Sequence, residues 1–143
     1  EPSSGQALVA DLACAEHFAD NRFDCILLMQ TLHRVYELRS AMQTLHRILK
    51  PGGVLLATVP GIGIIKQHPD ENAGYWAFTE RALEGLFKES FPGGTIKVDA
   101  KGNVLAATAF LHGLTADQLS QSELELVDRH YPLLLTIRAI KQQ

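Results

Sequence analysis

Residues 46–61 read HRILKPGGVLLATVPG, and this stretch decides the fold. Its first part closes an apolar-periodic segment, and Pro51 cannot continue a helix because its ring removes a backbone donor. Gly52 and Gly53 then permit the left-handed geometry with which a chain leaves a helix sharply. Residues 54–59, VLLATV, form a near-continuous apolar run, as do strands of a parallel sheet covered by helices. The stretch therefore predicts a helix, a tight turn and a buried strand.

Upstream, residues 23–29 read FDCILLM and follow the turn-rich residues 19–22. This run predicts a strand that is buried on both faces. Residues 37–49 carry apolar side chains at the three- and four-residue spacing of one helical face, which predicts an amphipathic helix. Its apolar residues are Leu38, Ala41, Met42, Leu45, Ile48 and Leu49. Strand, helix and strand make a βαβ unit, whose crossover is right-handed in nearly all proteins.

Downstream, residues 61–74 are Gly-rich and polar and predict a loop at the carboxyl end of the strand. Thr79 is in the position of a helix N-cap, with Glu80 in the first turn, and residues 92–94, PGG, end that helix. Alternation over residues 95–99 predicts a strand. Residues 104–114 predict a buried helix because they are apolar and Ala-rich.

Two capping boxes follow, Thr115 with Gln118 and Ser120 with Glu123. One of them is expected to start a short helix near residues 116–127, and the sequence leaves the choice open. Residues 133–140 predict a last strand.

Composition bounds the function. At 143 residues and 46% hydrophobic content, residues 1–143 are expected to form one domain. The 13 basic and 16 acidic residues give a net charge of −3 without a basic patch, so no nucleic-acid partner is expected. No apolar run approaches the roughly 20 residues that span a bilayer, so no membrane association is expected. Cys14 and Cys25 match no metal motif and suit a reducing cytoplasm as buried or idle thiols. The histidines show no paired spacing, so no metal site is expected.

Four segments in order resemble one family: FDCILL at 23–28, QTLH at 30–33, LHRILKPGG at 45–53 and YWAFT at 75–79. Together they resemble the second half of a class I S-adenosylmethionine-dependent methyltransferase of the type 11 kind. The resemblance extends over nearly the whole chain, and its specific part is residues 11–61. It implies a partial Rossmann-like α/β fold, with a mostly parallel sheet, an antiparallel final strand and helices on both faces.

The resemblance also implies site residues. Asp11 and Leu12 match the family's adenine-binding pair, in which a carboxylate and a backbone amide meet the base edge. The alternative for Asp11 is that it only caps a turn. Gln30 and Thr31, after the first strand, match positions facing the methionine part of the cofactor, at the edge where open α/β sheets bind ligands.

Leu32 and His33 are implied as lining of the methyl-transfer pocket, together with Tyr75 and Trp76. His33 is a candidate base toward a substrate hydroxyl because its ordinary pKa is near neutrality. The alternative is a pocket-lining or structural histidine, since many methyltransferases need only proximity and orientation. The rings of Tyr75 and Trp76 either close over the ligand or pack beneath the loop.

The sequence departs from the family in one respect. The family's first strand leads into a G-x-G-x-G loop and its second strand ends in an acidic residue, whereas Gly5 stands alone here. We therefore expect the carboxyl-terminal half of the fold, truncated and inactive as an isolated chain, with S-adenosylmethionine bound only in the full-length family context.

The absence of the first strand leaves the strand at residues 23–29 as an apolar edge, partly covered at most by a short strand at Ala7 to Ala10. We expect a homodimer, or association with the missing amino-terminal half. Two functions stay open. The first is a methyltransferase-like protein with a small-molecule or sugar-like acceptor, and the second is a shortened, non-catalytic dimeric binding or scaffold module of the same descent.

Overall fold

A computed structural model describes residues 10–63 and 74–143. The elements in chain order are β1 (Phe23–Met29), the 3-10 helix η1 (Leu32–Arg34), α1 (Leu38–Ile48), β2 (Leu49–Pro60), α2 (Glu80–Ser90), β3 (Thr95–Lys101), α3 (Val104–Leu111), the 3-10 helix η2 (Ala116–Gln118), α4 (Gln121–Glu125) and β4 (Leu134–Ile140). In these stretches no helix is long and apolar enough to cross a membrane. The strand expected at Ala7 to Ala10 and the loop expected at 61–74 lie largely outside the described residues.

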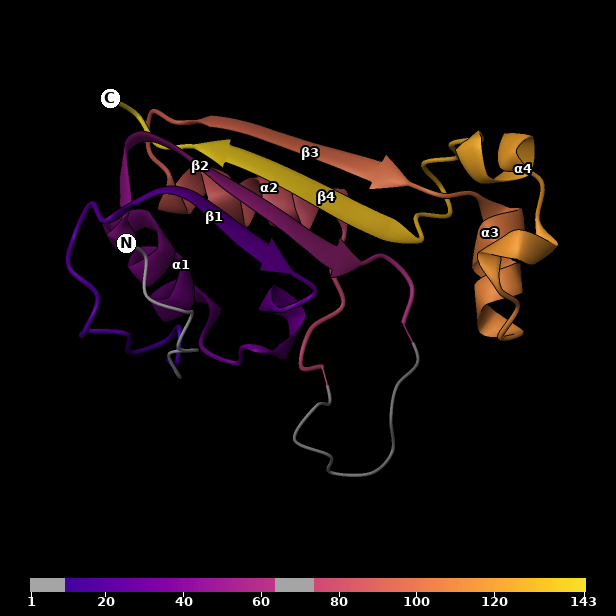
Figure 1. Cartoon of the computed structure of the whole chain (residues 1–143), viewed down its shortest axis with the longest axis horizontal. Helices are drawn as coiled ribbons and strands as arrows, with labels where there is room; N and C mark the ends of the chain where they lie inside the picture. The colour runs from indigo at the N-terminus through magenta and orange to yellow at the C-terminus, as the bar shows by residue number, and fades with distance from the viewer. Residues whose placement is uncertain (1–9, 64–73) are drawn as a thin grey trace, which may run out of the picture.

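The four strands form one sheet in the order β1-β2-β4-β3. β1 pairs with β2 in parallel, whereas β4 runs antiparallel to both of its neighbours, β2 and β3. β1, β2 and β3 therefore point the same way, and the final strand is reversed (Figure 1). The α/β fold class and the antiparallel final strand are confirmed, and the sheet is mixed in its pairing.

Helices α1 and α2 pack on one face of the sheet, behind the strands in Figure 1. Side chains alternate along each strand, so every second residue points into this layer. Leu28, Ala57, Ile137 and Val98 lie in one row across the four strands and are all buried. Met42, Leu45, Leu83 and Phe87 cover them from the helices.

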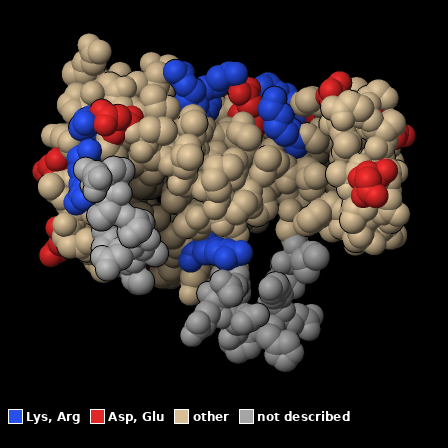
Figure 2. All heavy atoms as spheres, in the orientation of Figure 1, with Lys and Arg blue, Asp and Glu red and all other residues tan. Residues whose placement is uncertain are grey.

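The opposite face of the sheet carries no helix among the described residues, which differs from the expected cover on both faces. Leu27 is 67% exposed and Met29 is 57% exposed, so the prediction that β1 is buried on both faces is wrong. An apolar run shows that a strand has no polar face, but it does not show that both faces are covered. Figure 2 views this open face, where tan surface lies over the middle of the sheet and charged residues gather along its upper rim.

The chain leaves α1 as sharply as predicted, but β2 begins at Leu49 and not at Val54, so residues 50–53 are part of the strand. α1 ends at Ile48 and β2 begins at Leu49, and Gly52 has a φ of +74°. Between Phe23 and Cys25 the register of β1 against β2 shifts, because residues 50–53 on β2 lie opposite the single Asp24 on β1. The β1–α1–β2 unit thus returns directly to the sheet, with its turn at the amino end of β2.

The remaining elements follow the sequence closely, with one correction. The Thr79 hydroxyl accepts a hydrogen bond from the amide of Ala82 at 3.1 Å, which confirms the cap of α2. Both capping boxes form, so each begins a short helix. The prediction that residues 104–114 form a buried helix is wrong in part, because α3 ends at Leu111 and only its alanine side is buried. The large apolar residues of that segment that are exposed are Val104, Leu105, Phe110, Leu111 and Leu114.

Candidate functional site

The carboxyl end of β1 is conformationally strained. Gln30 has a φ of +50°, a left-handed conformation that is uncommon for a residue with a side chain. The end of β2 holds it there, because the Gln30 amide donates to the Thr58 carbonyl at 2.9 Å and lies 3.2 Å from the Thr58 hydroxyl. The Gln30 side-chain amide also donates to that hydroxyl at 3.2 Å. Such strain gathers at functional sites, so this strand end is the first place to look for a ligand.

Helix η1 follows at once and anchors the site. Leu32 is fully buried beneath it, and the Thr31 hydroxyl donates to the Met29 carbonyl at 2.9 Å. Burial, and to a smaller extent the positive charge of Arg34, lowers the pKa of His33 below its ordinary value of 6.5. His33 is therefore neutral at pH 7. Its Nδ1 is buried and has no hydrogen-bond partner among the described residues.

A second segment, distant in sequence, meets His33. The His33 carbonyl accepts hydrogen bonds from the amides of Tyr75 at 2.8 Å and Trp76 at 3.2 Å. Gly74 lies against the His33 ring, where an added Cβ would come within 2.9 Å of Cδ2. The structure thus brings together residues of the predicted substrate pocket that come from both segments.

Tyr36 belongs to the same group and is not among the residues inferred from the sequence. Its ring centroid lies 5.4 Å from that of Tyr75 in an edge-to-face arrangement and 6.2 Å from that of Trp76 in a near-parallel one. The only signal in the sequence was an aromatic residue three positions after His33. Because the partner ring is 39 residues away, periodicity within one element could not have found the pair.

Asp11 serves a local turn. Its Oδ1 accepts a hydrogen bond from the amide of Ala13 at 2.9 Å, which agrees with the turn-capping alternative. Leu12 is partly buried and packs against the core. No hydrogen bond or ion pair in the described part of the chain joins Asp11 or Leu12 to Gln30 or Thr31, and their role toward a cofactor stays a prediction.

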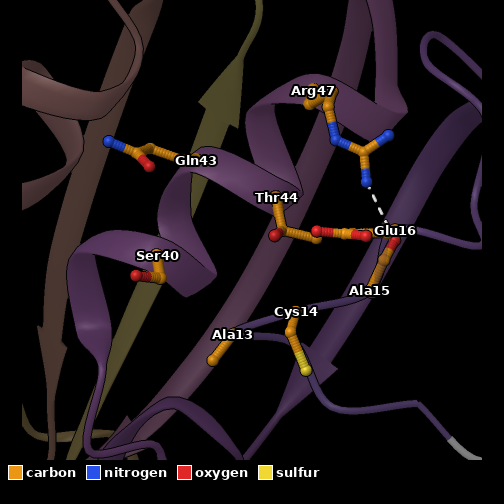
Figure 3. A pocket seen from close by; sticks show the side chains of 8 residues that line it. All are labelled: Ala13, Cys14, Ala15, Glu16, Ser40, Gln43, Thr44 and Arg47. Atoms are coloured by element: carbon orange, nitrogen blue, oxygen red, sulfur yellow. Dashed lines mark hydrogen bonds between the residues drawn. The ribbon is translucent and has the colours of Figure 1, made fainter.

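One hollow of about 290 Å³ lies between residues 13–16 and α1 (Figure 3). Arg47 spans it, donating to the Ala15 carbonyl at 2.8 Å and pairing with Asp20 at 2.7 Å. The negative charge of Asp11, followed by partial burial, raises the pKa of the Cys14 thiol. Cys14 stays protonated at pH 7 and is a poor nucleophile. Both cysteines are free and exposed, so the prediction of buried thiols is wrong, and that of idle thiols stays a prediction.

A second hollow of about 520 Å³ lies on the open face of the sheet. Leu27, Met29 and Leu56 line its apolar side, and Lys97, Asp99 and Arg138 line its charged side. Neither hollow is lined by the four residues predicted to bind S-adenosylmethionine.

Comparisons with known proteins bear on the resemblance. Residues 2–57 match the model of the methyltransferase domain family. The ubiquinone/menaquinone biosynthesis C-methyltransferase UbiE of Haemophilus ducreyi is 48% identical over 46 residues, which are 31% of this chain and 18% of that protein. UbiE of Klebsiella pneumoniae is 49% identical over 39 residues, 27% of this chain and 16% of that protein. The matched segment thus spans less than a fifth of these relatives.

Solved structures agree on the fold. A phosphoethanolamine N-methyltransferase of Haemonchus contortus, in complex with S-adenosyl-L-methionine, has a TM-score of 0.62 at 19% identity, covering 93% of this chain and 36% of that one. The [4+2]-cyclase SpnF has a TM-score of 0.59 at 21% identity, covering 93% and 55%. A putative methyltransferase of Haloferax volcanii, in complex with its Trm112 activator, has a TM-score of 0.62 at 16% identity, covering 95% and 61%. Because SpnF is a cyclase, the fold by itself does not determine the chemistry.

Proposed function

We propose, from the premise that this chain belongs to the class I S-adenosylmethionine-dependent methyltransferase family, that it provides the acceptor-binding side of a methyltransferase acting on a small molecule. The observation that carries the proposal is the strained Gln30 at the carboxyl end of β1, with His33, Tyr75 and Trp76 beside it. That edge is where open α/β sheets bind their ligands. His33 is neutral at pH 7 and can accept a proton from an acceptor hydroxyl.

The chain by itself binds S-adenosylmethionine weakly under this proposal and is inactive alone. Two observations support this statement: residues 1–143 contain no G-x-G-x-G loop, and neither of the two hollows described above is lined by Asp11, Leu12, Gln30 or Thr31. The two free, exposed cysteines support a reducing cytoplasmic setting for the protein.

Amide chemical shifts measured by NMR during titration with S-adenosylmethionine test the proposal. We expect millimolar affinity, with the largest shifts at Gln30 and Thr31 and smaller ones at Asp11 and Leu12. Adenosine triphosphate is the control ligand, because it shares the adenine and the ribose and lacks the methionine part. Shifts that avoid Gln30 and Thr31, or that adenosine triphosphate reproduces there, contradict the proposed site. Micromolar affinity contradicts the weak binding.

A second candidate function is a non-catalytic module that forms a homodimer through β1. It is favoured by the difference between the two edges of the sheet. Among residues 10–63 and 74–143, β1 pairs only with β2 and exposes Leu27 and Met29, whereas the β3 edge carries Lys97 and Asp99, which form an ion pair at 2.8 Å. Natural sheets protect their edges with such charges, and β1 has none on its open face.

Sedimentation equilibrium tests this second function. We expect a dimer that Leu27→Lys weakens at least about tenfold, because a charge at an edge strand opposes strand pairing. Leu111→Lys is the matched control, since Leu111 is 57% exposed on α3 and away from the sheet. A wild-type chain that is monomeric at about 100 µM rules out the module as a stable dimer.

A further inference from the structure

Three aromatic side chains form an outward-facing cluster at the strand ends. Tyr36 is 64% exposed, Tyr75 63% and Trp76 42%, so these rings do not serve the hydrophobic core. They come from two segments, one after η1 and one before α2. We call these three residues the aromatic cluster. A contiguous exposed aromatic patch of this kind marks a binding surface more often than an isolated exposed ring does.

Hydrogen bonds hold the cluster in place although it is exposed. The indole Nε1 of Trp76 donates to the Val35 carbonyl at 2.9 Å, and the amides of Tyr75 and Trp76 both donate to the His33 carbonyl. Gly74 permits this approach, because a Cβ there would contact the His33 ring. A surface ordered before its ligand arrives loses less conformational freedom on binding.

The geometry of the rings favours a flat partner. Tyr36 and Trp76 are inclined by only 25°, and Tyr75 meets Tyr36 edge-to-face at 66°. Aromatic rings prefer offset-stacked or edge-to-face partners, and a planar ligand extends the same arrangement. A cation is disfavoured, because the positive charge of Arg34 is close enough to act on His33 beside the cluster.

We propose that Tyr36, Tyr75 and Trp76 bind the methyl acceptor as a planar aromatic ring stacked on their exposed faces. The proposal has two parts. That a planar ring binds to the cluster needs no S-adenosylmethionine, and only the statement that this ring is the methyl acceptor rests on the proposed function. His33 joins the two segments of the cluster through its backbone, because its carbonyl accepts hydrogen bonds from the amides of Tyr75 and Trp76.

Saturation-transfer NMR with three probes tests the proposal. The probes are 2-naphthol, its saturated analogue decahydro-2-naphthol and tetramethylammonium. We expect 2-naphthol to bind at least about tenfold more tightly than the other two. Tyr36→Leu keeps apolar bulk without the ring and should weaken 2-naphthol binding about fivefold, whereas Tyr36→Phe should keep it.

Phe110→Ala is the matched control. The Phe110 side chain is 43% exposed, almost the same as the 42% of Trp76, but it lies on α3 and outside the aromatic cluster. It should leave 2-naphthol binding unchanged. Equal binding of the saturated analogue would show a merely apolar patch and overturn the proposal. Stronger binding of tetramethylammonium would show a cation site and overturn it as well. Thermal melts identify variants that fail to fold, and Tyr75→Leu then replaces Tyr36→Leu in the same comparison. None of these outcomes depends on the S-adenosylmethionine titration, so the two proposals fail separately.

Discussion

Single backbone positions decide how the chain turns in this protein. Gly52 has a φ of +74° near the start of β2, where the chain has just left α1, and Gln30 has a φ of +50° without being glycine. The first position uses the residue type that tolerates such geometry at little cost. At Gln30 the left-handed conformation is strained because the residue has a side chain, and hydrogen bonds to Thr58 hold the backbone in this conformation. The contrast separates a glycine that serves the fold from a strained residue that marks the site.

Replacement of glycine by alanine should change stability in opposite directions at two positions. Gly52→Ala should lower the free energy of unfolding by about 1 kcal/mol, because a left-handed φ strains any residue with a Cβ. Gly85→Ala should raise it by about 0.5–1 kcal/mol, because Gly85 lies in α2 with open space around the added Cβ. Urea denaturation of both variants measures the difference. A stabilised Gly52→Ala would show that the turn does not hold the conformation described.

At the scale of elements, local signals predicted more than long-range ones. β1 has the predicted bounds of 23–29, and the Thr79 cap and both capping boxes form, because each depends on residues within four positions. The exposed side of α3 and the meeting of Tyr36 with Trp76 could not be predicted, since both depend on which distant segment packs nearby. The apolar residues of a segment show which side chains can be buried, but the segment that packs against them determines which side chains are buried.

The α3–α4 lobe depends on one buried polar residue. Asn103 caps α3 by accepting from the Ala106 amide at 2.9 Å, and its Nδ2 donates to the carbonyls of Glu123 and Leu126. Asn103→Ala should cost about 2–3 kcal/mol, because it removes the cap and leaves two carbonyls without a donor. Hydrogen exchange should accelerate over residues 104–127 and stay unchanged in β2.

Asn103→Asp provides the matched comparison for this residue. It keeps the oxygen that caps α3 but places a buried carboxylate oxygen against the carbonyls of Glu123 and Leu126, so it should cost at least as much as Asn103→Ala. If Asn103→Ala accelerates exchange in β2 as much as in α3, the lobe is not a separate unit of stability.

At the scale of the whole molecule, two histidines link stability to pH. Burial lowers the pKa of His33, with a smaller effect of Arg34, and burial lowers the pKa of His46, with a smaller effect of Lys141. Below pH 6.5 the unfolded chain therefore binds protons that the folded chain does not. The free energy of unfolding should fall as the pH drops from about 6.5 to about 5.

Urea denaturation at several pH values measures this dependence. The double variant His33→Gln with His46→Gln should show a flatter profile between pH 6.5 and pH 5 than the wild-type chain. His112→Gln changes an exposed histidine at the end of α3 and serves as the control. Equal slopes for the double variant and the wild-type chain would show that neither imidazole is disfavoured as a cation in the folded state.

The open face of the sheet also has a direction. Leu27, Leu56, Arg138 and Lys97 form one row across the four strands, so the surface passes from carbon to positive charge within the width of the sheet. A covering surface therefore needs an apolar side over β1 and β2 and a polar side over β4 and β3. If the covering surface were rotated by 180° on the sheet, its apolar side would bury the Lys97 ammonium and its polar side would lie over Leu27. The gradient thus selects the orientation of whatever covers the face, independently of how tightly it binds.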